Sequence, residues 1–268
     1  MILSLITNNP LAAKNAEIAR IERIMIDLET FGKQQRQLGR NLYHSDHQIS
    51  DVYEIKKVLN RSEVVVRINS IHEHSKNEIE SIINLGADRI MLPYFKSIKE
   101  VEVLCTIIDN RVKIILLLET IESLKMLNDL IRINRDFEFH FGLNDLCINL
   151  NWKSIFQPFY DDSLLPYIEL LNQNKLNFGI GGIGAISNTS LSIESELILA
   201  EQIRLGCNLG WMGRSFRNHV DTLNVEMMQT EINLIRVATK KWQNSSSSNL
   251  ILNKMKLNNA IKNWESTL

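Results

Sequence analysis

The feature that most limits how this chain can fold is a regular alternation of strand-like and helix-like segments along its length. Short apolar runs rich in β-branched and aromatic residues read as strands that are buried on both faces. They lie at residues 2–6, 23–28, 63–69, 89–93, 113–119, 138–143, 177–181 and 209–213. Eight strands, each followed by a helix, within about 250 residues are typical of a barrel. We therefore predict an α/β fold, a single (β/α)8 TIM barrel with an extra C-terminal helical segment.

A doubly wound open sheet is the alternative fold. Such sheets usually carry a glycine fingerprint directly after the first strand. Here that position is occupied by Thr7, Asn8, Asn9 and Pro10. The barrel is therefore favoured.

Helix boundaries are indicated by capping patterns. Ser75 with Glu78, and Ser97 with Glu100, each have the spacing of a capping box before an apolar helical stripe. Gly86 follows the first of these stripes, where a glycine C-cap is expected.

A polar stretch, NSSSSN, follows Trp242 and predicts a flexible linker. Beyond it, apolar residues at helical spacing predict a helix over residues 249–264. We expect residues 1–243 to form the catalytic barrel domain. Residues 244–268 are expected to form the linker and a C-terminal helix, which packs on its own subunit or on a neighbouring one.

Charge and composition exclude several classes of protein. The 268 residues include 30 basic and 31 acidic side chains, for a net charge of −1, so no nucleic-acid or membrane-surface partner is expected. The opening segment MILSLITNNP lacks a basic region and predicts a first strand instead of a signal peptide. No run reaches the ~18 apolar residues that span a bilayer. Three cysteines without metal-type spacing favour free thiols. A cytoplasmic protein is expected.

Two carboxylates mark the predicted active-site rim. Glu119 ends one buried strand, and Asp145 follows the next one along the chain. In a barrel, the carboxyl ends of the strands are where active sites are built. Oxygen ligands without a nearby Cys/His pattern suit a hard cation, Mg²⁺ or Mn²⁺. Alternatively, each acid caps the following helix or pairs with a surface lysine.

Neighbouring strands add further charged residues at this rim. Asp27 and Glu29 end the second predicted strand, and Arg67 emerges from the third. An arginine on a buried strand needs an anion, because an unpaired buried charge is costly. Its two-pronged guanidinium suits a substrate carboxylate. The alternative is an internal salt bridge to Asp27 or Glu29, and both arrangements could hold.

A glycine-rich segment, residues 179–184, follows the seventh predicted strand, and Arg214 follows the eighth. Loops after these strands are the usual phosphate site of barrel enzymes. Gly181, Gly182 and Arg214 are therefore candidates for binding a phosphate or cofactor. Alternatively, the glycines only relieve crowding against a bound substrate.

Histidines supply the candidates for a general base, since imidazole titrates near neutral pH. His44 and His47 lie in the loop after the second strand, and His72 and His74 lie after the third. His47, next to Asp46, is the favoured base. His140 alternates with Phe139 and Phe141 within a strand, so we expect a structural role for it in the barrel core or the helix layer.

Several segments together carry a family resemblance: MIDLE, VVVRIN, GADRIMLPYFKSIKEVE, ILLLETIESL and FHFGLNDL, in this order. Across residues 23–150 the chain resembles the HpcH/HpaI aldolase and citrate lyase β-subunit family of phosphoenolpyruvate/pyruvate-binding barrels. The resemblance implies a divalent ion, usually magnesium, held by Glu119 and Asp145. It also implies that Arg67 grips a keto-acid carboxylate and that Asp27 and Glu29 lie near the metal's waters. Such barrels commonly form homo-oligomers.

The leading hypothesis is a metal-dependent carbon-carbon lyase, an aldolase acting on a 2-oxo acid through a pyruvate-like enolate. Two features depart from the family pattern: Thr30 follows Glu29, where a second acid is usual, and the nearest histidine in the following loop is His44, where the bacterial aldolase branch has one near the loop's start. The same loop carries Lys33, Gln34, Arg36 and Arg40 and is polar and basic enough to contact an acidic or phosphorylated substrate. These departures leave the substrate's partner and the base open. A phosphoenolpyruvate-using transferase or mutase is an alternative, as is a catalytically idle barrel that serves as a binding or assembly subunit.

Overall fold

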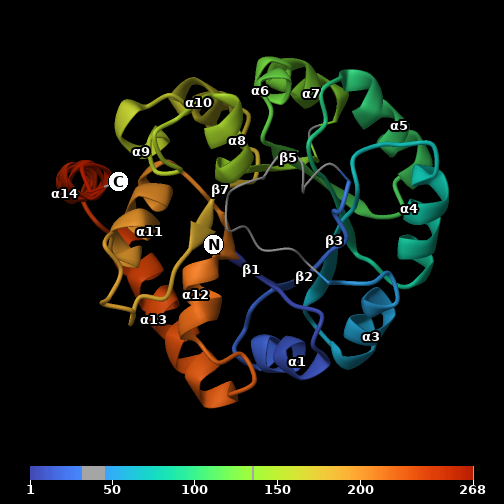
Figure 1. The fold of residues 1–268 in the computed structure, drawn as a ribbon, viewed down its shortest axis with the longest axis horizontal. Coiled ribbons are helices and arrows are strands. Elements are labelled where there is room, and N and C mark those ends of the chain that lie inside the picture. Colours follow the sequence, from blue (N-terminus) through green and yellow to red (C-terminus); the bar gives the residue numbers. More distant parts are fainter. Residues whose placement is uncertain (32–45, 135, 268) are drawn as a thin grey trace.

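Parallel strands form a ring, with helices packed around it, in the computed structural model, which describes residues 1–31, 46–134 and 136–267 (Figure 1). The strands are β1 (Ile2–Ile6), β2 (Arg23–Asp27), β3 (Glu63–Arg67), β4 (Arg89–Leu92), β5 (Lys113–Leu118), β6 (Glu138–Phe141), β7 (Phe178–Ile180), β8 (Gly182–Ile183) and β9 (Leu209–Met212). Within the described residues they are ordered β7-β6-β5-β4-β3-β2-β1-β9-β8. The predicted α/β barrel is confirmed.

The seventh predicted strand, residues 177–181, corresponds to β7 and is followed directly by a second short strand, β8, that was not predicted. β7 pairs with β6, whereas β8 pairs with β9. Gly181 lies between them with a φ of +57°, a left-handed conformation that glycine adopts without steric cost. The change of direction at Gly181 lets one segment join both of its neighbours and complete the ring.

Helices connect the strands and cover the outside of the ring. The described helices are α1 (Pro10–Ile18), α3 (Asp51–Val58), α4 (Ser75–Asn84), α5 (Ile98–Ile108), α6 (Ile121–Lys125), α7 (Leu127–Ile133), α8 (Leu143–Asn149), α9 (Pro158–Asp161), α10 (Leu165–Gln173), α11 (Ser195–Arg204), α12 (Arg214–His219), α13 (Val225–Gln243) and α14 (Ser247–Glu265).

The capping predictions had different outcomes. Ser97 caps α5 by accepting a hydrogen bond from the Glu100 backbone N–H, as predicted, and Gly86 follows α4 with a φ of +100°. The prediction of a capping box at Ser75 is wrong. The N-cap of α4 is His74, and the Ser75 hydroxyl instead accepts the backbone N–H of His72 at 2.8 Å. Ser75 therefore closes the preceding loop, so its hydroxyl is turned away from the helix.

The inside of the barrel is layered because side chains on a strand alternate between its two faces. Met25, Val65, Met91, Ile115 and Leu117 form an apolar middle layer within the ring. The intervening residues face outward and belong to the larger core between strands and helices. Alternation then places Asp27 and Arg67 above the middle layer, at the carboxyl ends of β2 and β3.

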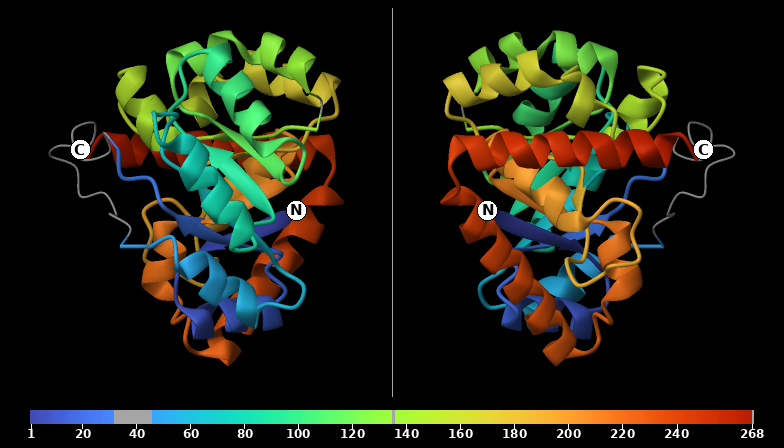
Figure 2. Two further views of the ribbon diagram at one scale, coloured as in Figure 1. Left: turned by 90° about the vertical axis from the view of Figure 1, so that its right-hand side faces the viewer. Right: turned by 90° about the vertical axis from the view of Figure 1, so that its left-hand side faces the viewer.

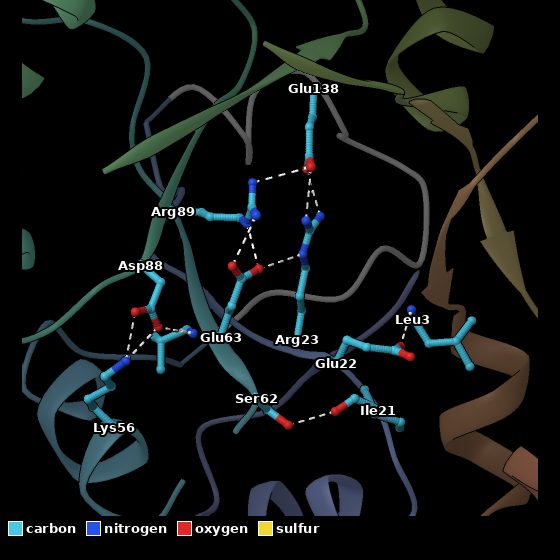
Figure 3. A network of polar contacts seen from close by, with 11 residues as sticks. Leu3, Ile21, Glu22, Arg23, Lys56, Ser62, Glu63, Asp88, Arg89 and Glu138 are labelled. Carbon is cyan, nitrogen blue, oxygen red and sulfur yellow. Dashed lines mark hydrogen bonds and ion pairs between the residues drawn. The ribbon is translucent and has the colours of Figure 1, made fainter. Parts of the chain in front are cut away.

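An ion network lies at the opposite, amino-terminal end of the strands (Figure 3). Arg23 donates to both carboxylate oxygens of Glu138, at 2.7 and 3.0 Å. Arg89 donates to both oxygens of Glu63, at 2.6 and 3.0 Å. The Arg23 Nε also reaches Glu63 at 3.0 Å, and Arg89 lies 3.2 Å from Glu138. Two arginines and two glutamates thus join β2, β3, β4 and β6.

The C-terminal helix α14 crosses the outside of the barrel (Figure 2). It packs against α11 and α9, and its Leu257 and Ile261 are fully buried. Its N-cap is Ser246, so the helix begins inside the serine run that we predicted as a linker. The division at residue 243 into barrel domain and tail stays a prediction. None of the helices described is both long and apolar enough to cross a bilayer.

Candidate active site

A cavity of about 480 Å³ lies at the carboxyl ends of the strands. Its lining includes most of the charged and glycine residues that the sequence singled out. These are Asp27, Glu29, Arg67, Glu119, Asp145, Gly181, Gly182 and Arg214. The carboxyl ends of the strands meet at one face of a parallel barrel. Residues from β2, β3, β5 and the segments after β6, β7 and β9 therefore lie at one site.

Arg67 is held by a carboxylate at this site. Its Nε and Nη2 donate to the two oxygens of Asp27, at 2.8 and 2.6 Å, and its Nε lies 3.5 Å from Glu29. Burial opposes the charge of Arg67, but the Asp27 and Glu29 carboxylates outweigh it and raise the pKa of the guanidinium. Nη1 makes no hydrogen bond to the described residues, so it is left to meet a ligand. The internal salt bridge and a substrate contact are thus compatible.

Glu119 is fixed at the end of β5 by its neighbours. Its side chain is 3% exposed, and one oxygen accepts the Tyr94 backbone N–H at 2.9 Å. A Cβ on residue 142 would lie 2.5 Å from the other oxygen, so Gly142 is required to leave room for the carboxylate. Glycine at this position lets the acid lie against the backbone of the next strand end.

Glu119 does not cap the helix that follows it. Thr120 is the N-cap of α6, and its hydroxyl oxygen accepts the Ser123 backbone N–H at 3.0 Å. Asp145 differs, because it lies in the first turn of α8, where a carboxylate is favoured by the helix dipole. Its side chain is nevertheless buried, and it lines the cavity together with Glu119. Both acids therefore face the same space.

A family model agrees with this arrangement. Residues 1–155, more than half of the chain, match the model described as HpcH/HpaI aldolase/citrate lyase. The chain belongs to this family. A search of curated proteins found no match.

Solved structures share the fold of this HpcH/HpaI family member. An HpcH/HpaI aldolase from Desulfitobacterium hafniense DCB-2 has 12% identity and a TM-score of 0.59, over 92% of this chain and 94% of that one. RipC from Yersinia pestis has 13% identity and a TM-score of 0.58, over 92% of this chain and 97% of that one. An HpcH/HpaI aldolase/citrate lyase family protein from Burkholderia cenocepacia J2315 has 14% identity and a TM-score of 0.61, over 90% of this chain and 93% of that one. The TM-scores show a common fold.

The HpcH/HpaI family is typically dependent on a divalent metal, and the residues here fit one. Mg²⁺ is usually held by one or two carboxylates and completes its shell with waters and substrate oxygens. Glu119 and Asp145 supply two buried carboxylates on one cavity. In the described part of the chain, no group of three or more His, Cys, Asp or Glu side chains is placed to hold a metal ion. Two carboxylates leave coordination positions for water and substrate oxygens, as Mg²⁺ prefers.

His47, the favoured base, lies beside the acids but not among the residues that line the cavity. It is 6% exposed, and its Nδ1 accepts the Asp27 backbone N–H at 2.9 Å. Burial lowers the pKa of His47, opposed by the nearby Asp27. Its role as a base stays a prediction. His44 and the loop residues Lys33, Gln34, Arg36 and Arg40 lie outside the described residues.

His140 is a cavity residue that the sequence interpretation assigned to structure alone. It does point into the barrel, where its ring stacks on Trp211 with centroids 4.0 Å apart and planes 7° apart. Its Nε2 lies 2.9 Å from the Gly181 carbonyl oxygen. Burial lowers the pKa of His140 to about 4, so the ring is neutral and Nε2–H donates to Gly181. His140 lies two residues after Glu138 on β6, so the side chains of both residues are on the same, inward face of the strand.

The glycine-rich loop and Arg214 reach the cavity from its other side. Gly182, Gly184 and Ser215 line it together with Arg214, which begins α12. A phosphate or cofactor contact at these residues stays a prediction. The remaining histidines have other surroundings: His72 Nε2 lies 2.8 Å from Glu78, and the His74 side chain is 74% exposed. Neither lines the cavity.

Proposed function

We propose that this protein is a metal-dependent carbon-carbon lyase, an aldolase that cleaves a 4-hydroxy-2-oxo acid to pyruvate and an aldehyde. One observation carries the proposal: Arg67, Glu119 and Asp145 line a single cavity in a member of the HpcH/HpaI family. An arginine and a hard-metal centre are the two groups that a 2-oxo carboxylate needs for recognition.

Each residue has a proposed part in binding. Glu119 and Asp145 would hold Mg²⁺ or Mn²⁺, which when bound polarises the 2-oxo group and favours the enolate. Arg67 offers Nη1 to the substrate carboxylate while Asp27 holds its Nε and Nη2. The guanidinium is therefore already oriented before substrate arrives, and less conformational entropy is lost on binding.

Cleavage breaks the bond between C3 and C4 of the substrate. The electron pair of that bond goes to C3 and gives the enolate, the C4 hydroxyl loses its proton to a base, and C3 then takes up a proton to give pyruvate. Glu29 lines the cavity, whereas His47 does not, so we assign the hydroxyl proton to Glu29. His47 would position Asp27 through its hydrogen bond to the Asp27 backbone N–H.

Calorimetric titration tests this function. Oxalate, which resembles the pyruvate enolate, should bind with Mg²⁺ or Mn²⁺ and not in EDTA. Glu119→Gln should weaken that binding by more than about tenfold, because a metal ligand loses its charge. Glu122→Gln is the matched control, an exposed acid one turn further on. Metal-independent oxalate binding, or equal binding by both variants, would refute the proposal.

A phosphoenolpyruvate-using transferase or mutase is the second candidate, favoured by Arg214 and the glycine loop at the same cavity. It predicts that phosphoenolpyruvate binds more tightly than pyruvate and that Arg214→Ala abolishes the difference. Aldol cleavage with no phosphate dependence supports the first function. Metal-dependent oxalate binding without turnover of a broad panel of oxo acids would support an idle barrel.

A further inference from the structure

The cavity has two chemically different sides. Its acids and Arg67 come from β2, β3, β5 and the start of α8, and Arg214 and Arg217 come from α12, whereas a further part of the lining is mainly apolar. The apolar side is formed by the segment before α9, by α9, by α11 with its preceding loop, and by α14. These helices lie together at one side of the barrel (Figure 1). The residues of this apolar wall are Ile155, Phe156, Phe159, Ile193, Ile198 and Trp264.

Two aromatic rings of the apolar wall keep part of their surface exposed. Phe156 and Trp264 are half-buried, whereas Phe159 beside them is 2% exposed. The rings of Phe156 and Trp264 meet edge to face, with centroids 5.4 Å apart. Aromatic surface that lines a cavity gains free energy when an apolar group displaces water from it. The apolar wall is therefore suited to an uncharged, hydrophobic ligand group.

The position of Trp264 is fixed by the next residue of α14. Glu265 is 4% exposed, and its two carboxylate oxygens accept the Ser154 hydroxyl at 2.5 Å and the Tyr160 hydroxyl at 3.0 Å. Ser154 and Tyr160 flank Phe156 in sequence. Burial and the Glu265 carboxylate raise the pKa of Tyr160 to about 12, so its hydroxyl remains a donor at neutral pH. The end of α14 is thus held by hydrogen bonds to residues before and after Phe156 in the chain.

The size of the cavity exceeds the needs of a three-carbon oxo acid. Its volume of about 480 Å³ falls in the ~300–1,000 Å³ range of pockets that enclose drug-sized ligands. With the carboxylate at Arg67 and the oxo group near Glu119 and Asp145, the remainder of the substrate extends toward the other side. A charged group that lies against the apolar wall, and not against Arg214 or Arg217 of α12, would lose its hydration without gaining a partner from the wall.

We propose that the substrate carries an aliphatic or aromatic group on C4, so that cleavage releases an uncharged hydrophobic aldehyde, and that Trp264 and Phe156 determine this specificity. This inference rests on the proposed aldolase function. The cleavage between C3 and C4 is unchanged, and only the substituent on C4 is specified further.

Two 2-oxo acids of similar reach test the inference without requiring turnover. 2-Oxo-4-phenylbutanoate places a ring where 2-oxoglutarate places a carboxylate. With Mg²⁺ present, calorimetry should show at least about tenfold tighter binding of the phenyl compound. Trp264→Ala and Phe156→Ala should each reduce this ratio to below about threefold while oxalate affinity is unchanged. Trp242→Ala is the control, because Trp242 lies on α13 outside this cavity.

The outcomes separate the two proposals. Absence of metal-dependent oxalate binding would overturn the aldolase itself. Normal oxalate binding with tighter binding of 2-oxoglutarate, or with a ratio unchanged in both variants, would overturn the apolar wall alone. If Trp264→Ala fails to fold, Ile198→Phe provides a second test, since the added bulk on α11 should weaken only the phenyl compound.

Discussion

Glu119 keeps its position because residue 142 has no side chain. In Gly142→Ala, the new Cβ would lie 2.5 Å from a Glu119 carboxylate oxygen and 2.8 Å from its Cβ. We expect the carboxylate to be displaced and metal-dependent oxalate binding to weaken by at least about tenfold, because a metal site needs its ligands closely placed. Calorimetry measures the loss.

The control for this substitution is Gly210→Ala. A Cβ on residue 210 is crowded to the same distance, 2.5 Å, but by the side-chain end of Ile183, and Gly210 does not line the cavity. It should lower stability without changing oxalate affinity. Equal loss of affinity in both variants would contradict the role given to Gly142.

Glu17 links stability to pH. Its carboxylate accepts the backbone N–H groups of Asn60, Arg61 and Ser62 and a bond from Lys14. Burial opposes ionisation, but these bonds outweigh it and lower the pKa of Glu17 from 4.5 to about 2. Because the folded-state pKa lies below the unfolded one, the stabilisation is complete above about pH 5 and is lost as the pH falls toward 2.

Glu17→Gln should therefore lower the free energy of unfolding at pH 7 by about 2–3 kcal/mol, and by much less at pH 3. Urea unfolding at the two pH values measures both differences. A loss of equal size at both would show that the carboxylate's ionisation is not what stabilises this loop.

The sequence predicted the cavity residues that lie near strand ends and missed a contact that depends on closure of the ring. Arg67 and Glu119 were predicted because they lie at the carboxyl ends of strands, and Asp145 because it closely follows one, and in a barrel these ends meet at one site. The stack of His140 on Trp211 joins β6 to β9, which come close only because the ring closes through the β7–β8 segment between them. No pattern within either strand shows which ring it will face.

Among the strands, β6 is fixed in the barrel by ion pairs at its first residue, Glu138. Glu138 is 5% exposed and bridges Arg23 and Arg89. Glu138→Gln should cost about 3–5 kcal/mol, because two buried arginine charges lose one carboxylate and are left to share Glu63. Glu80→Gln removes a similar two-bond contact to Arg111 at the surface and should leave the unfolding midpoint nearly unchanged. Thermal unfolding compares them, and similar midpoints would refute the difference.

The predicted strands overlap the observed ones, with ends within two residues, because a short buried run has a clear composition. The additional strand β8 after Gly181 was not predictable from the same pattern. It depends on which neighbours the segment pairs with, and pairing is a property of the closed ring. The start of α14 inside the serine run was likewise missed, since Ser246 serves as a cap there.

At the scale of the whole molecule, α14 is joined to the barrel by a few buried residues. Leu257 is fully buried, whereas Met255 on the same helix is 60% exposed. Leu257→Ala should lower the free energy of unfolding by about 2–5 kcal/mol, because it leaves a cavity between α14 and the barrel. Met255→Ala should change it little. Chemical unfolding measures both, and equal effects would mean that α14 does not pack here in solution.

The ion network at the amino-terminal end of the barrel has a consequence for folding. Arg23 and Glu138 are 115 residues apart in the chain and join β2 to β6. A fragment that ends after β4 contains Arg23, Arg89 and Glu63 but lacks Glu138. In such a fragment Arg23 keeps its contact to Glu63 but loses both hydrogen bonds to Glu138. We therefore expect the network to form only when β6 arrives, which favours folding of the barrel as one cooperative unit.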